Sequence, residues 1–367
     1  MSAGHVQRLD RTVEALRAQG LTGLLVGPSA DLRWLVGYEA LPLERLTLLA
    51  VPADGEPFLL VPRLEQARAQ ACGAGDLVEL VAWSETEDPV AIVSRRLGAG
   101  DGPRRFAVQD RMWSMFTLRL QAALDDASWV PGSTIMRDLR IRKQPEEIEA
   151  LRAAGQAIDA VHAQMPDLLR PGRTERDVGR DVAERILDEH DVVNFVIIGS
   201  GPNGASPHHE TGDRVLERGD AVVVDIGGAR GGYCSDSTRN YVLGPATTEY
   251  QHLHDVLQRA HRAAVEAVCP GVAAASIDRA ARKVIIDAGM GERFIHRTGH
   301  GIGLEEHEEP WIVEGNEEPV EAGMAFSVEP GIYVEGRFGA RIEDIVVVTD
   351  VGVDLLNRRP RDLIVCD

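Results

Sequence analysis

The sequence is poor in cysteine, and its cysteines do not pair in any recognisable motif. Four cysteines are scattered along 367 residues, with no two at C-x-x-C spacing: Cys72, Cys234, Cys269 and Cys366. This spacing argues against a disulfide framework and against a zinc cluster built on cysteine. We therefore expect reduced thiols in a cytoplasmic protein.

The chain also lacks long hydrophobic runs and an excess of positive charge. Its first ten residues, MSAGHVQRLD, contain no apolar core of a signal peptide, and no run is long enough to span a bilayer. The formal net charge of −19 disfavours nucleic acid and anionic membranes as partners, because both are negatively charged. The 44% of hydrophobic residues is enough to bury the cores of two domains.

Residues 1–137 read as an α/β domain. Val6, Leu9, Val13 and Leu16 recur at helical spacing, and this first helix stops at Gly20. Strands and helices then alternate. The predicted strands are Leu24–Val26, Leu46–Val51, Phe58–Val61, Leu77–Ala82 and Arg105–Gln109, and the predicted helices are Arg63–Cys72, Pro89–Leu97 and Ser114–Leu124. No cluster of potential ligands occurs in this domain.

A second domain is expected at residues 138–367. The charged stretch Asp138–Gln144 is interpreted as the linker, and Pro145 suits the first turn of a helix that runs to about Leu169. Thr174 and Asp177 resemble a capping box for the next helix. From there the order is helix, helix, hairpin, followed again by helix, helix, hairpin. Such a duplicated α+β unit predicts a site on a pseudo-twofold axis between two sheets.

Two acids in the first hairpin carry the chemistry. Asp225 and Asp236 lie on strand-like runs joined by a glycine-rich turn, in VVVDIGGARGGYCSDSTRNY, so a hairpin can bring both carboxylates onto one face. Two like charges held so close repel each other unless a proton or a cation lies between them. The apolar neighbours Val222–Val224 argue against an ordinary solvated face. A metal site is therefore the first hypothesis.

The second hairpin repeats this pattern. Glu329 and Glu343 flank its turn, and the lead-in E-x-G-x-A at Glu217 recurs at Glu321, with Glu329 in the place of Asp225. His300, in RTGHGIGLEEH, lies between the two hairpins. Four carboxylates and one imidazole suit a pair of divalent ions. Hard oxygen donors favour Mn²⁺, and the imidazole also allows Co²⁺, Fe²⁺ or Zn²⁺.

These residues lie in segments that resemble a known family. The segments are GSGPNGASPHH (199–209), VVVDIGG, YCSDSTR, HRTGHGIGLEEH (296–307), SVEPGIY (327–333) and ARIED (340–344). Together they resemble the pita-bread metallopeptidases, peptidase family M24, which include Xaa-Pro dipeptidase (prolidase), aminopeptidase P and the metal-free relative creatinase. The resemblance implies an α+β pita-bread domain with an internal pseudo-twofold repeat. The preceding α/β domain resembles, more weakly, the creatinase-type N-terminal domain.

The resemblance also implies roles for the site residues. Asp225 would bind one metal ion, Asp236 and Glu343 would bridge two, and His300 and Glu329 would bind the second. A hydroxide shared by the metals would attack the scissile carbonyl, with Glu329 as the proton shuttle. His208 and His307 match catalytic histidines. His296, Arg341 and Tyr333 match residues that line or support the substrate pocket.

Some of these assignments stay open on the residues alone. His209 is adjacent to His208 and would face the opposite way in an extended segment, so a role for it is an alternative. For His296 and Arg341, support of a neighbouring group explains the motif as well as direct substrate binding does. Cys234 is read as a small filler beside Asp236. The remaining histidines are expected at the surface: His5, His162, His190, His252, His254 and His261.

The expected substrates are short proline-containing peptides. The pattern tilts towards a dipeptidase, with aminopeptidase P activity on longer Xaa-Pro peptides as the alternative. A creatinase-like amidinohydrolase and an inactive binding homologue are less favoured, because all five ligand positions are present. The family's usual form is a homodimer in which an N-terminal loop closes the site. Asp31–Arg45 is the candidate lid here, with Trp34, Tyr38, Glu39 and Arg45, and Arg45 is a hypothetical partner of the dipeptide carboxylate.

Overall fold

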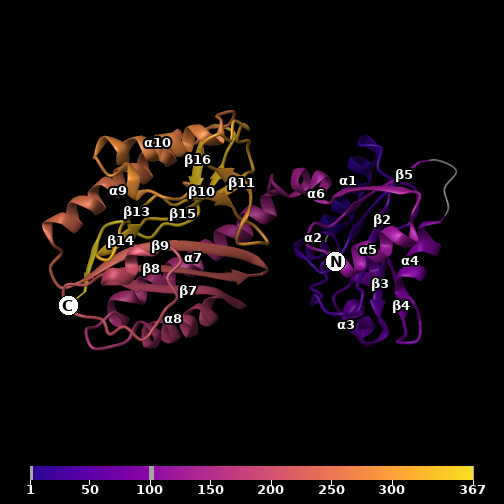
Figure 1. Cartoon of the computed structure of the whole chain (residues 1–367), viewed down its shortest axis with the longest axis horizontal. Coiled ribbons are helices and arrows are strands. Elements are labelled where there is room, and N and C mark those ends of the chain that lie inside the picture. Colours follow the sequence, from indigo (N-terminus) through magenta and orange to yellow (C-terminus); the bar gives the residue numbers. More distant parts are fainter. Residues whose placement is uncertain (1–2, 99–102, 367) are drawn as a thin grey trace. The chain divides into compact units, whose positions relative to one another are not determined.

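The computed structural model describes residues 3–98 and 103–366 and divides into two units, Met1–Arg140 and Ile141–Asp367 (Figure 1). Each unit has its own hydrophobic core. The division falls after residue 140, where the sequence led us to expect it after residue 137. Within the described residues, no helix combines the length and the apolar character that a bilayer crossing requires.

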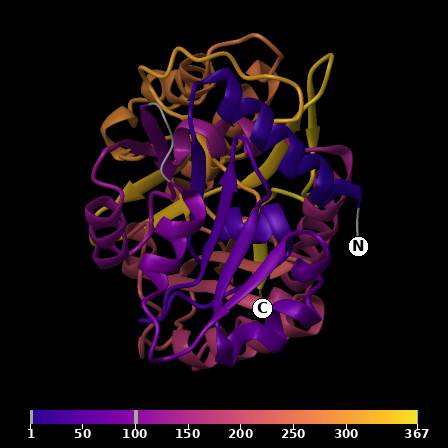
Figure 2. The same ribbon diagram turned by 90° about the vertical axis from the view of Figure 1, so that its right-hand side faces the viewer.

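The N-terminal unit is built on one mixed sheet of six strands in the order β4-β3-β2-β1-β5-β6. Strand β2 pairs antiparallel with β1 and β3, and the remaining pairs are parallel. Figure 2 shows strands of this unit in indigo and purple. The strands are β1 Gly23–Val26, β2 Leu48–Pro52, β3 Phe58–Pro62, β4 Glu79–Trp83, β5 Arg104–Val108 and β6 Ala127–Pro131. All five strands predicted for this domain are present, and β6 was missed.

Six α-helices belong to the described part of this unit. They are α1 Ala3–Ala18, α2 Ala30–Val36, α3 Gln66–Ala71, α4 Pro89–Leu97, α5 Ser114–Ala123 and α6 Ser133–Arg140. Side chains from α4 and α5, such as Val93 and Leu120, pack with Leu48 and Leu60 of the sheet in one core. Burial of these apolar side chains, more than helix propensity, holds the short helices in place.

Two expectations for this region are wrong. The predicted linker begins too early, because Asp138 to Arg140 form the last turn of α6, which buries Ile135, Met136 and Leu139. The candidate lid is wrong in part as well, because Trp34 and Tyr38 are 1% exposed and belong to the core of the unit.

The C-terminal unit contains three sheets. A four-stranded sheet has the order β17-β9-β8-β7, a five-stranded sheet has the order β11-β10-β12-β15-β16, and β13 pairs with β14. The first sheet comprises β7 Val192–Ser200, β8 Ala221–Arg230, β9 Tyr233–Leu243 and β17 Ile364–Cys366. The second comprises β10 Gly299–Gly301, β11 Glu308–Ile312, β12 Ala325–Val328, β15 Asp344–Val348 and β16 Val353–Leu355. The short hairpin is β13 Gly331–Val334 and β14 Phe338–Arg341.

A pair of helices covers each of the two larger sheets. Helices α7 Pro145–Leu168 and α8 Glu175–Glu189 pack on β7, β8 and β9, whereas α9 Thr248–Ala267 and α10 Ala274–Asp287 pack on the second sheet. Figure 1 shows the two helix pairs on opposite sides of the strands. The order of two helices followed by paired strands thus occurs twice, as the sequence predicted.

The starts of α7 and α8 follow from their sequences. Pro145 occupies the first turn of α7, and Gln144 and Glu147 form a capping box there. At α8, the Thr174 hydroxyl accepts a hydrogen bond from the Asp177 backbone N–H at 3.1 Å. These caps satisfy backbone donors that would otherwise have no partner at the helix start.

Four histidines expected at the surface are buried instead: His162, His190, His254 and His261. Polar partners compensate the burial of three of them. His162 contacts the Tyr241 hydroxyl and the Ser237 carbonyl, both at 3.1 Å. His190 lies 2.9 Å from the Ser235 hydroxyl, and His261 lies 3.0 Å from Asp344. Because these partners come from other elements, the helical position of a histidine alone did not reveal its burial.

Candidate metal centre

The first two acids lie on the hairpin of β8 and β9. Asp225 pairs in register with Thr238, and Asp236 pairs with Gly227. Since side chains alternate along a strand, Asp225, Asp236 and Thr238 lie on one face of the sheet. Ordinary antiparallel register therefore brings together two carboxylates that are eleven positions apart (236 − 225) in the sequence.

The other two acids flank the antiparallel pair β12 and β15. Glu329 follows the last residue of β12, and Glu343 precedes the first residue of β15. The hairpin of β13 and β14 is inserted between them. An isolated bridge links Thr238 with Glu343, whose backbone N–H donates to the Thr238 carbonyl at 3.2 Å. The two larger sheets of this unit therefore meet at the acids.

His300 is the central residue of β10, which lies between β11 and β12. Its neighbours on both sides are glycines for a steric reason. A Cβ atom on Gly299 would lie 1.8 Å from the Ser327 carbonyl oxygen, and one on Gly301 would lie 2.2 Å from that of Glu309. The GHG sequence therefore lets three strands approach closely while it holds one imidazole among the acids.

The side chains of Asp236, His300 and Glu343 converge. Each offers one ligand atom, and these three atoms lie within 4.8 Å of one another. Glu329 adjoins the cluster, with its Oε1 3.4 Å from His300 Nε2. Asp225 is held differently, because its Oδ1 accepts from the Thr238 hydroxyl at 2.8 Å and its Oδ2 pairs with Arg341.

The electrostatics of the cluster fit a divalent cation. Burial, with repulsion from neighbouring carboxylates, raises the pKa of Asp236 and of Glu343 well above the usual values. Burial also raises the pKa of Glu329 to about 7. The pKa of His300 is lowered to about 3, chiefly by burial, so its imidazole is neutral and can donate a lone pair. A bound cation would relieve this repulsion, and the carboxylate and imidazole donors suit it.

The cluster faces a cavity of about 770 Å³. The residues called catalytic from the sequence, His208 and His307 beside Glu329, line this cavity, as do His296 and Arg341. Phe195, Ile197 and Ile295 contribute an apolar part of the wall. The volume suits a small molecule, and the mixed lining offers both hydrophobic contact and polar anchors.

The loop that carries His208 is anchored by a buried carboxylate that sequence reasoning missed. Glu175, on the first turn of α8, accepts hydrogen bonds from the backbone and hydroxyl of Ser200 at 2.8 and 2.6 Å. It also lies 2.7 Å from His209 Nε2 and accepts from Asn203. The two adjacent histidines therefore differ in surroundings: His208 lines the cavity, and His209 binds the anchor.

Tyr333 lies behind the cavity wall, because it is absent from the lining and its hydroxyl contacts two lining residues. His296 Nε2 and Arg341 Nη1 each lie 2.9 Å from this hydroxyl. Arg341 also donates to Thr238 and to the Pro207 carbonyl next to His208. Burial lowers the pKa of His296 to about 4 and raises that of Tyr333 to about 12, so both side chains are neutral near pH 7.

Two further residues of the site were not found from the sequence. Arg297 lines the cavity, and its guanidinium lies 4.4 Å from the centre of the Trp311 ring. Its position between His296 and His300, two residues predicted for the site, could have indicated that it lies in the site. Thr238 contacts both Asp225 and Glu343 through its hydroxyl, at 2.8 and 2.7 Å. Its place two residues after Asp236, on the same strand face, would have indicated this role.

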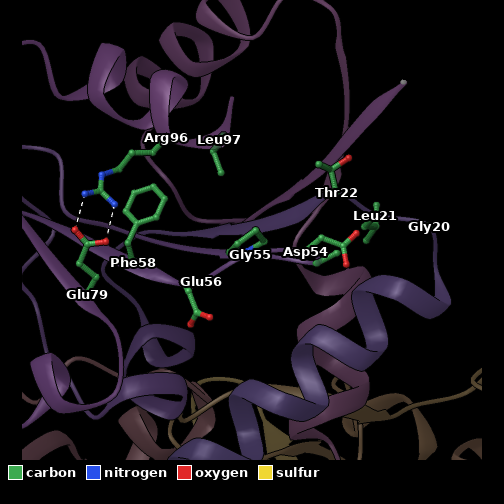
Figure 3. Close-up of a pocket in the computed structure, with 12 residues that line it drawn as sticks. Gly20, Leu21, Thr22, Asp54, Gly55, Glu56, Phe58, Glu79, Arg96 and Leu97 are labelled. Atoms are coloured by element: carbon green, nitrogen blue, oxygen red, sulfur yellow. Dashed lines mark hydrogen bonds and ion pairs between the residues drawn. The ribbon is translucent and has the colours of Figure 1, made fainter. Parts of the chain in front are cut away.

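The N-terminal unit has hollows of its own. One, of about 410 Å³, is lined by residues of the β2–β3 turn, by Glu79 and by Arg96 (Figure 3). Its lining includes no histidine or cysteine, and Arg96 lies over Phe58 and donates to Glu79. Arg45, the hypothetical partner of a dipeptide carboxylate, pairs with Glu44 and with Glu85 at 2.7 Å. These acids already satisfy its charge in the structure.

Comparison with known proteins gives matches along almost the whole chain. Residues 8–142 match the family model of the creatinase/prolidase N-terminal domain, and residues 149–350 match metallopeptidase family M24. A probable dipeptidase PepE of Mycobacterium tuberculosis is 50% identical over 98% of this chain and 96% of its own length. A Xaa-Pro dipeptidase of Lactobacillus delbrueckii is 33% identical, covering 97% of this chain and 98% of its own.

A solved structure supports the same conclusion. The prolidase of Thermococcus sibiricus is 34% identical and superposes with a TM-score of 0.93 over 100% of both chains. Sequence and structure thus agree for both units, the creatinase-type N-terminal domain and the pita-bread catalytic domain. This chain belongs to metallopeptidase family M24 and carries the creatinase/prolidase-type N-terminal domain.

Proposed function

We propose that this protein hydrolyses Xaa-Pro dipeptides with the help of two divalent metal ions. The observation that carries the proposal is the convergence of Asp236, His300 and Glu343, with ligand atoms within 4.8 Å, at the wall of a cavity lined by further histidines. Asp225 and Glu329 would complete the two metal positions. Two cations would lower the pKa of a water molecule that they share, which supplies a nucleophile near neutral pH.

The chain's own residues would bind the substrate and move the proton. Glu329, which adjoins the cluster, is the proposed group that accepts the proton of the attacking water and passes it on. His208 and His307 would contact the scissile amide from the cavity wall. His296 is neutral, and Tyr333 together with Arg341 would fix its orientation. Arg341 would fix the orientation of Asp225 through the ion pair between them.

A dipeptide substrate is favoured over a longer peptide by the relatives that match the full chain. The mycobacterial relative carries the name dipeptidase, and the lactobacillar one carries the name Xaa-Pro dipeptidase. The cavity of about 770 Å³ is compatible with a dipeptide. Removal of the first residue from longer Xaa-Pro peptides is the other outcome that the experiment below can give.

Mn²⁺ is the metal that we propose first. Carboxylate oxygens outnumber the single imidazole nitrogen in the proposed donor set, and hard oxygen donors suit Mn²⁺, whereas Co²⁺, Fe²⁺ or Zn²⁺ would also bind this set. We further propose a homodimer in the cytoplasm. Cys72, Cys234 and Cys269 are free thiols, which is consistent with a reducing compartment.

The test is hydrolysis by metal-free protein reloaded with Mn²⁺. Rates on Xaa-Pro dipeptides are compared with those on matched Xaa-Pro-Yaa tripeptides, and Asp236→Asn serves as the variant that removes a bridging carboxylate. We expect metal-dependent cleavage of dipeptides by the wild type and none by the variant. Faster cleavage of the tripeptides would replace the dipeptidase assignment with an aminopeptidase. Failure to cleave either set would refute the proline specificity.

A further inference from the structure

One carboxylate in the cavity belongs neither to the metal cluster nor to an ion pair. Glu306 lies in the segment between β10 and β11, directly before His307, and lines the same cavity as the metal cluster. The Cys234 backbone N–H donates to the carbonyl of Gly303, which ties this segment to the start of β9. Glu306 therefore lies near the strand that carries Asp236.

No group of the described residues neutralises the Glu306 carboxylate. The structure gives it no hydrogen bond and no ion pair within residues 3–98 and 103–366, although it is half-buried and burial raises its pKa. Its neighbour Glu308 pairs with Lys143, and Arg297, which lines the same cavity, lies over Trp311. A half-buried anion without a partner is unfavourable unless a ligand supplies the opposite charge.

The backbone of Cys234 ties the segment that carries Glu306 to the strand that carries Asp236. Gly303, three residues before Glu306, accepts a hydrogen bond from the Cys234 backbone N–H at 2.8 Å. Cys234 lies two residues before Asp236, on the same face of β9. Glu306 thus flanks the cluster along the strand and offers its charge to a substrate whose scissile bond lies at the metals.

Another part of the cavity wall is apolar. Phe195 and Ile197 alternate on β7 and both line the cavity; Ile197 pairs in register with Asp225 and Phe195 with Gly227. Ile295 adds a further apolar side chain at the rim, where it is 66% exposed. An apolar wall with one unpaired anion suits a long aliphatic side chain that ends in a cation, which is the build of arginine and lysine.

We propose that Glu306 selects substrates in which Xaa is arginine or lysine. The inference rests on the proposed function, because it takes the bond to proline as the one cleaved. The aliphatic stem of Xaa lies against Phe195 and Ile197, and its charged end pairs with the Glu306 carboxylate. Glu306 is thus a specificity residue, distinct from the residues that bind metal.

The test compares Arg-Pro with norleucine-Pro, which has an aliphatic Xaa side chain and no charge. We expect the wild type to favour Arg-Pro in kcat/KM by about tenfold, the size of one charge-assisted contact. Glu306→Gln should bring this ratio close to one, because it should lower kcat/KM for Arg-Pro much more than for norleucine-Pro. Glu335→Gln, at an exposed position in the same unit, removes the same charge from the protein and should retain the tenfold ratio.

A binding measurement gives a readout that does not need turnover. Calorimetry on metal-free protein should show tighter binding of Arg-Pro than of norleucine-Pro, and Glu306→Gln should remove the difference. Charge reversal gives a third check, since Glu306→Arg should favour Glu-Pro over Arg-Pro.

Three results would overturn the proposal in different ways. An equal loss on both dipeptides in Glu306→Gln would assign the carboxylate to the α-amino group or to the fold. Equal use of both dipeptides by the wild type would remove the basic preference while leaving the dipeptidase function intact. If no Xaa-Pro peptide is cleaved at all, the proposed function and this inference fall together.

Discussion

Two buried carboxylates of the C-terminal unit have opposite surroundings. Glu175 is 0% exposed and accepts hydrogen bonds from several neighbours, whereas Asp236 is 4% exposed and faces other acids. Hydrogen-bond donors favour the ionised form of a carboxyl group, and neighbouring anions disfavour it. Removing the charge should therefore have opposite effects on stability at the two positions.

Asp236→Asn should stabilise the metal-free protein at neutral pH. The pKa of Asp236 is raised in the folded state, so its ionisation disfavours folding as the pH rises above the unfolded value near 3.8. The neutral amide removes this effect, and we expect a gain on the order of 1–3 kcal/mol in the free energy of unfolding at pH 7.5. Thermal or urea unfolding in a chelator measures it.

Added Mn²⁺ should make the wild type more stable than Asp236→Asn, the reverse of the order without metal. The wild type gains stability because the cation binds the folded state, and the variant has lost a ligand. At pH 3 the gain in the metal-free variant should vanish, since Asp236 is then protonated in both states. A metal-free variant less stable than the wild type at pH 7.5 would contradict the repulsion on which this prediction depends.

Glu175→Gln should destabilise the protein by about 2–3 kcal/mol at pH 7, because an amide cannot accept all the hydrogen bonds that the carboxylate receives. Burial alone would raise the pKa of Glu175, but hydrogen bonds from Ser200, His209 and Asn203 outweigh it and the pKa is lowered. Chemical unfolding of both proteins across a pH series measures the difference.

The sign of the pH effect follows from the lowered pKa of Glu175. A depressed pKa contributes stability that is present above the unfolded value of 4.5 and is lost as the pH falls through the folded value. The difference between wild type and variant should therefore be full at pH 7 and shrink below pH 4.5. A difference that persists unchanged at low pH would mean that Glu175 acts through packing instead of charge.

At the scale of residues, the sequence was informative where spacing fixes geometry. Asp225 and Asp236 could be placed on one face because strand periodicity is strict, and the structure brings Asp236 together with His300 and Glu343. Glu175 could not be found in this way, since its partners lie on a loop 25 or more residues away. The roles of the individual site residues stay predictions until variants are measured.

At the scale of elements, strand β10 depends on its glycines. It is only three residues long, and strands β11 and β12 flank it on both sides. The Cβ of an alanine at Gly299 would lie 1.8 Å from the Ser327 carbonyl oxygen, a distance that real atoms do not tolerate. The strand would have to move away from β12 and take His300 with it.

Gly299→Ala should consequently destabilise the fold by about 3 kcal/mol or more and weaken metal binding. Gly352→Ala is the matched control, because a Cβ there meets no atom within 4 Å and the backbone is not in the left-handed region. We expect the control to stay within about 0.5 kcal/mol of the wild type. Urea unfolding and Mn²⁺ titration test both variants, and equal stability of the two would refute the packing argument.

Elements were predicted well where hydrophobic pattern and turn residues agree. The five strands predicted for the N-terminal unit and the helices α4, α5 and α7 have bounds close to the expected ones, and α8 begins directly after the expected capping residue Thr174. The last turn of α6 was taken for a linker because of its charges, although Ile135, Met136 and Leu139 have the spacing of a buried helix face. The charged residues on the exposed side of this short helix favoured the interpretation as a linker, because three apolar residues are only a weak helix pattern.

At the scale of the whole molecule, the proposed ligands all lie in the unit Ile141–Asp367. Metal binding should therefore slow hydrogen exchange of backbone amides in β8, β9, β10 and β15, because it links the two sheets of that unit. Exchange in β1 to β6 of the other unit should be unchanged. Hydrogen exchange followed by mass spectrometry, with and without Mn²⁺, measures both, and Asp236→Asn is the control that should show no slowing.

The repeated order of elements divides the proposed ligands between the two halves of the C-terminal unit. Asp225 and Asp236 come from the first half, and Glu329 and Glu343 come from the second. An ancestral polypeptide of half the length of this unit would have carried only two of these acids, so it could have formed such a centre only by assembling with a second copy of itself. Gene duplication and fusion would then have joined the two copies in one chain. Both halves would have kept metal ligands, and one half would have been free to change into the wall that contacts the substrate.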